Sequence, residues 1–68
     1  MTLTIKINLD NAAFKHDDGS LDYGTVSETV YIVSKWVESG EKSGSIGDGN
    51  GNTVGKFEIK ESNHDLHL

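Results

Sequence analysis

The 68-residue chain contains no cysteine, no arginine and no long hydrophobic run. Without cysteine, neither a disulfide framework nor a thiolate zinc site can stabilise the small core. A chain of this length buries only about 60% of its unfolded surface, so its stability depends on good packing or on oligomerisation. The absence of cysteine also fits a reducing compartment, and we expect a cytoplasmic protein.

The charge balance is acidic. Eleven Asp and Glu residues against six lysines give a formal net charge of −5 at pH 7. Such a surface repels nucleic acids and anionic membranes, because phosphate binding needs clustered Lys and Arg. The complementary partner would be a basic protein surface; the alternative is that the charge serves solubility alone. No segment has the roughly 18–20 apolar residues of a membrane span, and the amino terminus lacks a signal-peptide pattern.

Residues 2–9 alternate between apolar and polar side chains, which predicts a half-buried strand. Its apolar residues share one face: Leu3, Ile5, Ile7 and Leu9. The turn residues Asp10 and Asn11 follow, and we expect Phe14 to plug one end of the core. Residues 15–24 are polar, contain two glycines and predict a loop.

Residues 25–39 predict a helix. Thr25 followed by Glu28 is typical of a capping box, and Gly40 stands where a glycine ends a helix. Four valines recur at the spacing i, i+4, i+7, i+11 and line one stripe: Val26, Val30, Val33 and Val37.

This helix carries a second apolar strip, formed by Thr29, Ile32 and Trp36, beside the valine stripe. Together the two strips span roughly 160°, more than the ~100° needed to face a sheet. One interpretation is that the loop folds over Ile32 and Trp36 through Leu21 and Phe14. The other is that this strip binds a partner or a second copy, because Trp is favoured at binding hot spots. The remaining helix residues point outward: Tyr31, Ser34, Lys35 and Glu38.

Residues 45–48 and 53–60 flank a Gly/Asn-rich segment and predict a β-hairpin. Asn50-Gly51 is the preferred centre of a two-residue type I′ turn, in which both central residues have positive φ. Val54 breaks the alternation set by Phe57 and Ile59, and the neighbouring Gly55 indicates a β-bulge.

The predicted elements follow the order β-α-β-β in one α+β domain, residues 1–60. If the three-stranded sheet is antiparallel, its first strand lies beside the third, giving the order 1-3-2 with the helix packed on one face. Residues 61–68 are polar and predict a flexible tail.

No motif predicts catalysis, a metal or a cofactor. The segment 48–52 begins like a calcium loop, but Thr53 and Ile59 stand where an EF-hand needs Gly and Glu. His64 and His67 would hold a divalent ion only if the tail became helical. Paired carboxylates act as acid and base only in a cleft that separates their pKa values, for which this chain has little volume. We therefore expect a protein that is not an enzyme.

Two motifs resemble those of very small proteins encoded by phages, prophages and mobile elements. They are D-N-A-A-F at residues 10–14 and D-x-N-G-N-x-V-G at residues 48–55, and the resemblance covers residues 2–59. It carries over no catalytic residue. What it implies is context, since small acidic proteins of this kind often occupy a host protein's surface. A host-defence inhibitor of the anti-CRISPR type, acting in the host cytoplasm, is the expected function.

The leading hypothesis is a protein that binds a host protein, whose target surface would be a basic, nucleic-acid-binding one. Ile32 and Trp36 would be the anchors, and acidic side chains would steer the encounter. The expected interface comprises Ile32, Trp36, Tyr31, Asp17, Asp18, Asp22, Glu38 and Glu41. Glu28 joins the acidic set if the surface mimics nucleic acid. The alternative is a homodimeric structural or accessory protein with no inhibitory role, which uses its Trp36 surface for self-association.

Overall fold

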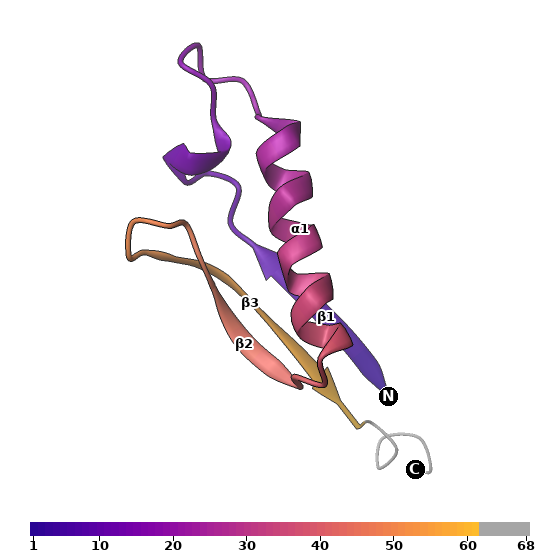
Figure 1. Ribbon diagram of the computed structural model, residues 1–68. Helices are drawn as coiled ribbons and strands as arrows, with labels where there is room; N and C mark the ends of the chain where they lie inside the picture. Colours follow the sequence, from indigo (N-terminus) through magenta and orange to yellow (C-terminus); the bar gives the residue numbers. More distant parts are fainter. Residues whose placement is uncertain (62–68) are drawn as a thin grey trace, which may run out of the picture.

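The computed structural model describes residues 1–61. One helix lies along one face of a three-stranded sheet (Figure 1). The elements are β1 (Thr2–Ile7), the short 3-10 helix η1 (Ala12–Phe14), α1 (Tyr23–Glu38), β2 (Ser43–Gly47) and β3 (Thr53–Lys60). The sheet is antiparallel in the order β1-β3-β2, so the predicted α+β fold and strand order are confirmed. Residues 62–68, with the candidate ligands His64 and His67, lie outside the described part of the chain.

The core lies between α1 and the sheet. Five side chains in it are at most 4% exposed: Phe14, Val33, Ile46, Val54 and Phe57. Phe14 plugs one end of the core, as predicted, but it does so from η1, a short helix that the sequence did not predict. The Asn11 side chain starts η1 by accepting a hydrogen bond from the N–H of Ala13 (2.8 Å).

Helix α1 begins at Tyr23, two residues before the predicted start, and the predicted capping box of Thr25 with Glu28 is wrong. Asp22 is the N-cap instead. Its carboxylate accepts hydrogen bonds from the Thr25 N–H (3.1 Å) and the Thr25 hydroxyl (2.8 Å). Thr25 therefore lies inside the first turn, because a carboxylate three residues earlier already satisfies its N–H.

The end of α1 is a Schellman motif around Gly40, which confirms the predicted stop. Gly40 has a φ of 98°, and its N–H donates to the carbonyl oxygen of Val37 (3.0 Å). The N–H of Glu41 donates to the carbonyl oxygen of Trp36 (3.1 Å). These two bonds satisfy carbonyls that the helix leaves unpaired and turn the chain into β2.

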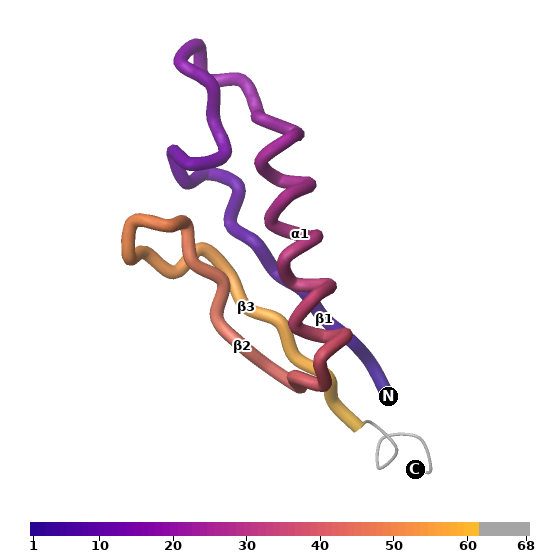
Figure 2. Tube along the Cα trace, viewed as in Figure 1, coloured from indigo at the N-terminus to yellow at the C-terminus, as the bar shows by residue number. Residues whose placement is uncertain are grey.

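The hairpin is confirmed, but its turn is not of type I′. Gly49 and Gly51 have φ values of 89° and 92°, whereas no non-glycine residue within 1–61 has a positive φ. The loop spans residues 48–52 and forms a broad tip (Figure 2). It is closed by the N–H of Asp48 donating to the carbonyl oxygen of Asn52 (3.0 Å). The Asp48 carboxylate also accepts from the Asn50 N–H (2.7 Å) and the Asn52 side-chain amide (3.0 Å), and these bonds favour the wider loop.

The predicted β-bulge is present in β3. Ile46 pairs with Gly55 and Gly47 pairs with Thr53, so Val54 has no partner on β2. The extra residue resets the alternation of side chains, and Val54 and Phe57 both reach the core. Strand β2 begins at Ser43, two residues before the predicted start.

The β1 side of the core is less covered than predicted. Strand β1 ends at Ile7 rather than at Leu9, and Leu3 and Ile5 remain 47% and 37% exposed. On α1, Val33 is fully buried while Val30 is 44% exposed. The valine stripe therefore faces the core at Val33, whereas the sheet leaves Val30 partly uncovered.

A substitution at Gly55 tests the close contact between β1 and β3. A methyl group at this position would overlap the backbone carbonyl oxygen of Lys6, so the two strands would have to separate. We expect Gly55→Ala to lower the free energy of unfolding by about 1–3 kcal/mol, the usual cost of overpacking. The control is Gly24→Ala in α1, where the added methyl has room and alanine favours the helix by up to about 1 kcal/mol. Urea denaturation that gave both variants the same stability would contradict this account.

Candidate protein-binding site

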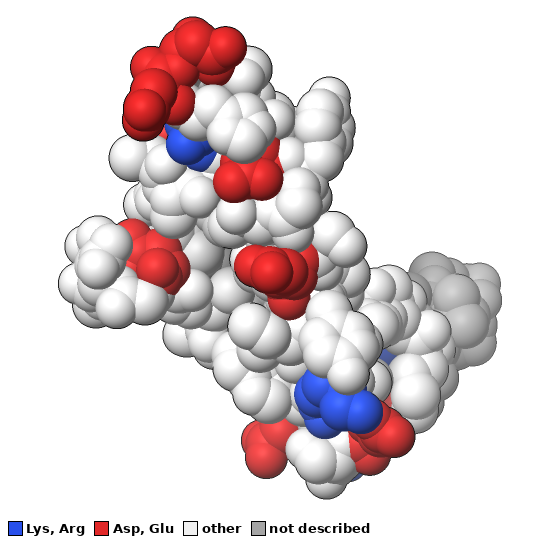
Figure 3. Space-filling model, turned by 45° about the horizontal axis from the view of Figure 1, so that its top comes forward, with Lys and Arg blue, Asp and Glu red and all other residues white. Residues whose placement is uncertain are grey.

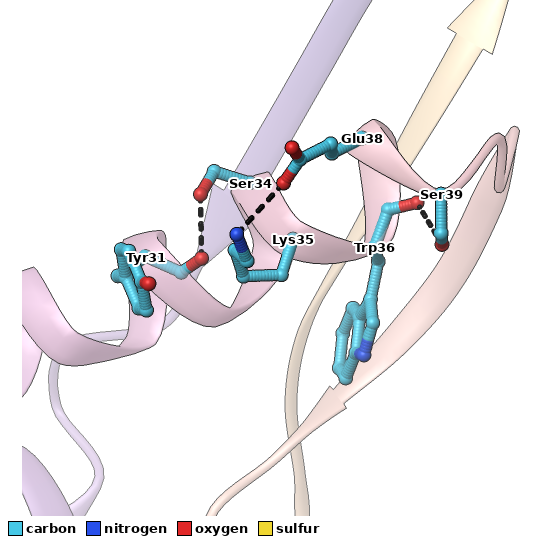
Figure 4. Close-up of polar contacts among 6 residues, drawn as sticks. All are labelled: Tyr31, Ser34, Lys35, Trp36, Glu38 and Ser39. Carbon is cyan, nitrogen blue, oxygen red and sulfur yellow. Dashed lines mark hydrogen bonds and ion pairs between the residues drawn. The ribbon is translucent and has the colours of Figure 1, made fainter.

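Helix α1 presents two different flanks on either side of the buried Val33. At about 100° per residue, Ile32 and Trp36 lie on one side of Val33, and Val30 and Val37 lie on the other. Trp36 stacks on Phe57 of β3, with ring centroids 5.9 Å apart and an interplanar angle of 25°. In Figure 4, Trp36 points from α1 toward β2. The Ile32/Trp36 flank therefore faces the β2 side of the sheet.

Two hollows lie along this flank. They share no lining residue, and together we call them the α1–β2 groove. The first, of about 250 Å³, lies between the end of α1 and β2. The second, of about 240 Å³, lies between α1, η1 and the hairpin tip. The lining residues on which the site depends are, along the groove, Glu41, Gly44, Trp36, Ile32, Glu28 and Asp48.

The floor of the groove is apolar and partly open to solvent. Ile32 is 48% exposed, and Trp36 is half-buried against Phe57. Gly44 lies opposite Phe57 in the sheet, and a Cβ atom there would come within 2.8 Å of the Phe57 ring. The missing side chain thus keeps the first hollow open. Phe14 packs into the core, Leu21 packs against it, and Phe14 lines the same hollow as Ile32. Ile32 still remains 48% exposed, so these residues do not cover it fully.

The rim of the groove is acidic. Glu28, Glu41 and Asp48 border it, and among the described residues no lysine lines either hollow. The hydrogen bond from the Asn52 side chain, followed by that from the Asn50 N–H, holds the pKa of Asp48 below its usual value. Asp48 therefore stays charged well below neutral pH. On the face shown in Figure 3, acidic atoms form several groups while lysine atoms are sparse.

Three of the predicted interface residues lie far from the groove's anchors. Asp17, Asp18 and Asp22 belong to the loop before α1, and Asp22 is about 21 Å from Trp36 along the helix axis (14 residues at ~1.5 Å each). Asp18 accepts hydrogen bonds from the N–H and the hydroxyl of Ser20 (2.9 and 2.6 Å). Asp18 and Asp22 thus organise the loop and the helix start, and the fold does not bring them to Trp36.

Tyr31 and Glu38 lie on the outward side of α1. The Lys35 ammonium is 2.8 Å from the Glu38 carboxylate and 5.7 Å from the Tyr31 ring centroid, and all three side chains point away from Trp36 (Figure 4). Of the eight predicted interface residues, the groove therefore contains Ile32, Trp36 and Glu41.

The interface predicted from the sequence lacked Gly44 and Asp48, and it included Glu28 only for a surface that mimics nucleic acid. Gly44 could have been recognised only once the hairpin register was known, because its role depends on lying opposite Phe57. The sequence pattern identifies Asp48 only as a turn residue. Its place beside the Ile32 hollow depends on how α1 lies relative to the hairpin tip.

The outer face of the sheet carries a larger hollow of about 750 Å³. Lys6 and Lys56 lie directly opposite each other there, with Ser45 next in the same row. Both lysines are exposed, and no buried side-chain polar atom within residues 1–61 lacks a partner. The α1–β2 groove, with its exposed anchor, is the better candidate.

The described residues do not indicate a metal site or a membrane span. Among residues 1–61, no three His, Cys, Asp or Glu side chains gather to hold a metal ion. In the same range, no helix combines the length and the hydropathy needed to cross a bilayer. Comparison of the chain with protein-family models, with curated proteins and with solved structures gave no significant match. The α1–β2 groove is therefore the feature of the described residues that best indicates a function.

Asp22 makes the helix start sensitive to acid. Hydrogen bonds from the Thr25 hydroxyl and then the Thr25 N–H hold the pKa of Asp22 below its usual value. A group with a lowered pKa stabilises the fold above its unfolded pKa, near 3.9, and this contribution is lost as the pH falls through the folded pKa. We expect Asp22→Asn to show a flatter loss of stability below about pH 4 than the original chain, because Asn caps the helix without titrating.

The matched control is Asp17→Asn, which removes the same charge from the same loop. The Asp17 side chain makes no hydrogen bond or ion pair within the described residues, so this variant leaves the Asp22 cap and its hydrogen bonds in place. Urea denaturation between about pH 2 and pH 7 measures both. Indistinguishable pH profiles for the two variants would show that Asp22 is not the titrating cap.

Proposed function

We propose that this chain is a non-enzymatic, phage- or mobile-element-type protein that binds a host protein through the α1–β2 groove and blocks the surface it occupies. The observation that carries the proposal is Ile32, 48% exposed, beside Trp36 in a groove with an acidic rim. Such a groove fits a partner that inserts an apolar side chain surrounded by Lys or Arg.

The expected partner has a basic surface, and this supports a target that binds nucleic acid. Proteins that hold phosphate backbones gather Lys and Arg on one surface. This chain, with its net charge of −5, would occupy that surface in place of the nucleic acid. The likeness of its two motifs to those of phage-encoded proteins supports a host-defence complex, which makes anti-CRISPR-type inhibition in the host cytoplasm the specific form of the proposal.

The apolar and acidic parts of the groove would contribute differently. Trp36 is held against Phe57 before any partner arrives, so its ordering costs little on binding. Burial of Ile32 and the remaining surface of Trp36 would determine how long the complex lasts. The rim carboxylates would raise the association rate, since complementary charges steer diffusional encounters.

Ile32 and Val30 provide a matched test of the binding flank. They are 48% and 44% exposed on opposite flanks of α1, so Ile32→Ser and Val30→Ser remove similar apolar groups from equally accessible positions. The measurement is inhibition of DNA binding by purified CRISPR effector complexes of a bacterial host. We expect Ile32→Ser to raise the half-inhibitory concentration at least about tenfold, or ~1.4 kcal/mol, and Val30→Ser to leave it unchanged.

Two results would overturn this proposal. The first is that no effector complex is inhibited while the immobilised chain captures only general chaperones from host lysate. The second is an equal loss of inhibition for both serine variants. Either result would favour the alternative of an accessory protein without an inhibitory role.

The rim charges give a second, kinetic prediction. We expect the double variant Glu28→Gln/Glu41→Gln to bind the inhibited complex with a slower association rate and a weaker dependence on salt, at nearly unchanged dissociation rate. Asp17→Asn/Asp18→Asn removes the same charge from the loop before α1, outside both hollows of the groove, and should slow association less. Surface plasmon resonance at two salt concentrations measures both. Steering by the rim is contradicted if the loop variant has the larger effect.

A further inference from the structure

Strand β1 is an edge strand with few of the features that normally protect a sheet edge. Among residues 1–61 it pairs with β3 and no other strand, and its six residues contain no proline and no bulge. Lys6 is its one charged residue, and alternation along the strand places Lys6 on the outer face of the sheet. The edge is therefore long, regular and open to another strand.

The hydrogen-bonding pattern shows which groups of β1 are available. The N–H of Asn8 donates to the carbonyl oxygen of Val54 on β3 (2.7 Å). Bonded residues alternate in an antiparallel ladder, so Thr4 and Lys6 bond toward β3. Leu3 and Ile5 direct their N–H and C=O groups away from it, and within residues 1–61 these groups have no hydrogen-bond partner.

Exposed apolar side chains lie beside this edge. Leu3, Ile5 and Val30 are 47%, 37% and 44% exposed. Val30 is about 120° around α1 from Trp36 (six residues at ~100° each). Because Trp36 faces the β2 side, Val30 lies on the flank nearer β1. We call Leu3, Ile5 and Val30 the β1 face.

The β1 face is uncharged, although 25% of the residues in the chain are charged. The helix positions that continue the Val30 flank outward are Tyr23, Ser34 and Ser27. Depletion of charge is typical of the core of a protein–protein interface. It matters here because two copies of a chain with net charge −5 can approach closely only through a surface without like charges.

We propose that two copies of this chain associate by antiparallel pairing of their β1 strands about a two-fold axis centred on Thr4. This register places Leu3 opposite the partner's Ile5, and Ile5 opposite the partner's Leu3. Lys6 lies opposite the partner's Thr2, so no like charges meet. The two sheets become one six-stranded sheet with both helices on the same face. The Val30 flanks of the helices then face each other across the centre.

The register follows from alternation and charge. A shift by one residue would pair apolar positions with polar ones and place the side chains on opposite faces. An axis centred on Lys6 would set two lysines against each other, which is unfavourable. An axis on Thr4 brings together the two most exposed inner residues of β1, Leu3 and Ile5. The contact uses the flank of α1 opposite the groove, so it is independent of the proposed function.

The first test is the mass of the intact chain in solution. We expect sedimentation velocity to show a monomer–dimer equilibrium between about 1 μM and 1 mM. Ile5→Lys should raise the dimer dissociation constant at least about tenfold, because it places a charge on the β1 face. Ile32→Lys makes the same change on the opposite flank, at a position 48% exposed, and should leave the dimer intact while abolishing binding to the inhibited complex.

The second test uses the lack of cysteine in the chain. In the proposed dimer the two Thr4 residues form a non-hydrogen-bonded pair with Cα atoms ~4.5 Å apart, which suits a disulfide. Thr4→Cys should therefore give a covalent dimer under mild oxidation. Thr2→Cys lies on the same face of the same strand, but the two copies of this residue would be about 13 Å apart and should crosslink far less.

Three outcomes would overturn the inference. They are a monomer over the whole concentration range, a dimer unaffected by Ile5→Lys, and equal crosslinking of the two cysteine variants. If circular dichroism shows that Ile5→Lys is unfolded, the comparison of Thr4→Cys with Thr2→Cys decides. Loss of inhibition in Ile32→Lys with an intact dimer separates this inference from the proposed function.

Discussion

The bulge in β3 is the constraint on which the rest of the structure depends. Because Val54 has no partner on β2, Val54 and Phe57 both face α1 and form the centre of the core. Gly55, next to the bulge, lets the β1 backbone come close. Phe57 in turn supports Trp36, and the register places Gly44 beside the Phe57 ring. The packing of the sheet and the opening of the groove therefore share one cause.

A single helix over three strands leaves two unequal flanks. On the β2 side, Trp36 is stacked on the sheet and Ile32 borders a groove with an acidic rim. On the β1 side, Val30, Leu3 and Ile5 are exposed without charge. The first surface is complementary to the basic partner that we propose, and the second to the same surface on another copy of the chain. The two proposed associations therefore use opposite flanks of α1.

Much of the fold could be predicted because its signals are local. The alternation in residues 2–9, the stop at Gly40 and the hairpin around residues 48–52 depend on neighbours in the sequence. The errors arose where two local signals compete. Asp22 and Thr25 are both good N-caps, and the carboxylate that reaches the Thr25 N–H and hydroxyl forms the cap. Asn50-Gly51 favours a tight turn, but the Asp48 carboxylate bonds to Asn50 and Asn52 and holds a wider one.

The three strands, the long helix, their order, the bulge and the acidic charge follow from the sequence alone, since each depends on periodicity, turn chemistry or composition. It also indicated that the apolar surface of α1 is too wide for one sheet. Which apolar residues stay uncovered depends on the tertiary packing. The helical pattern predicts that Ile32 and Trp36 are exposed anchors. No sequence pattern predicts the exposure of Leu3, Ile5 and Val30, because it depends on where α1 crosses the strands. That position is set by contacts between residues far apart in the chain, to which a local pattern is insensitive.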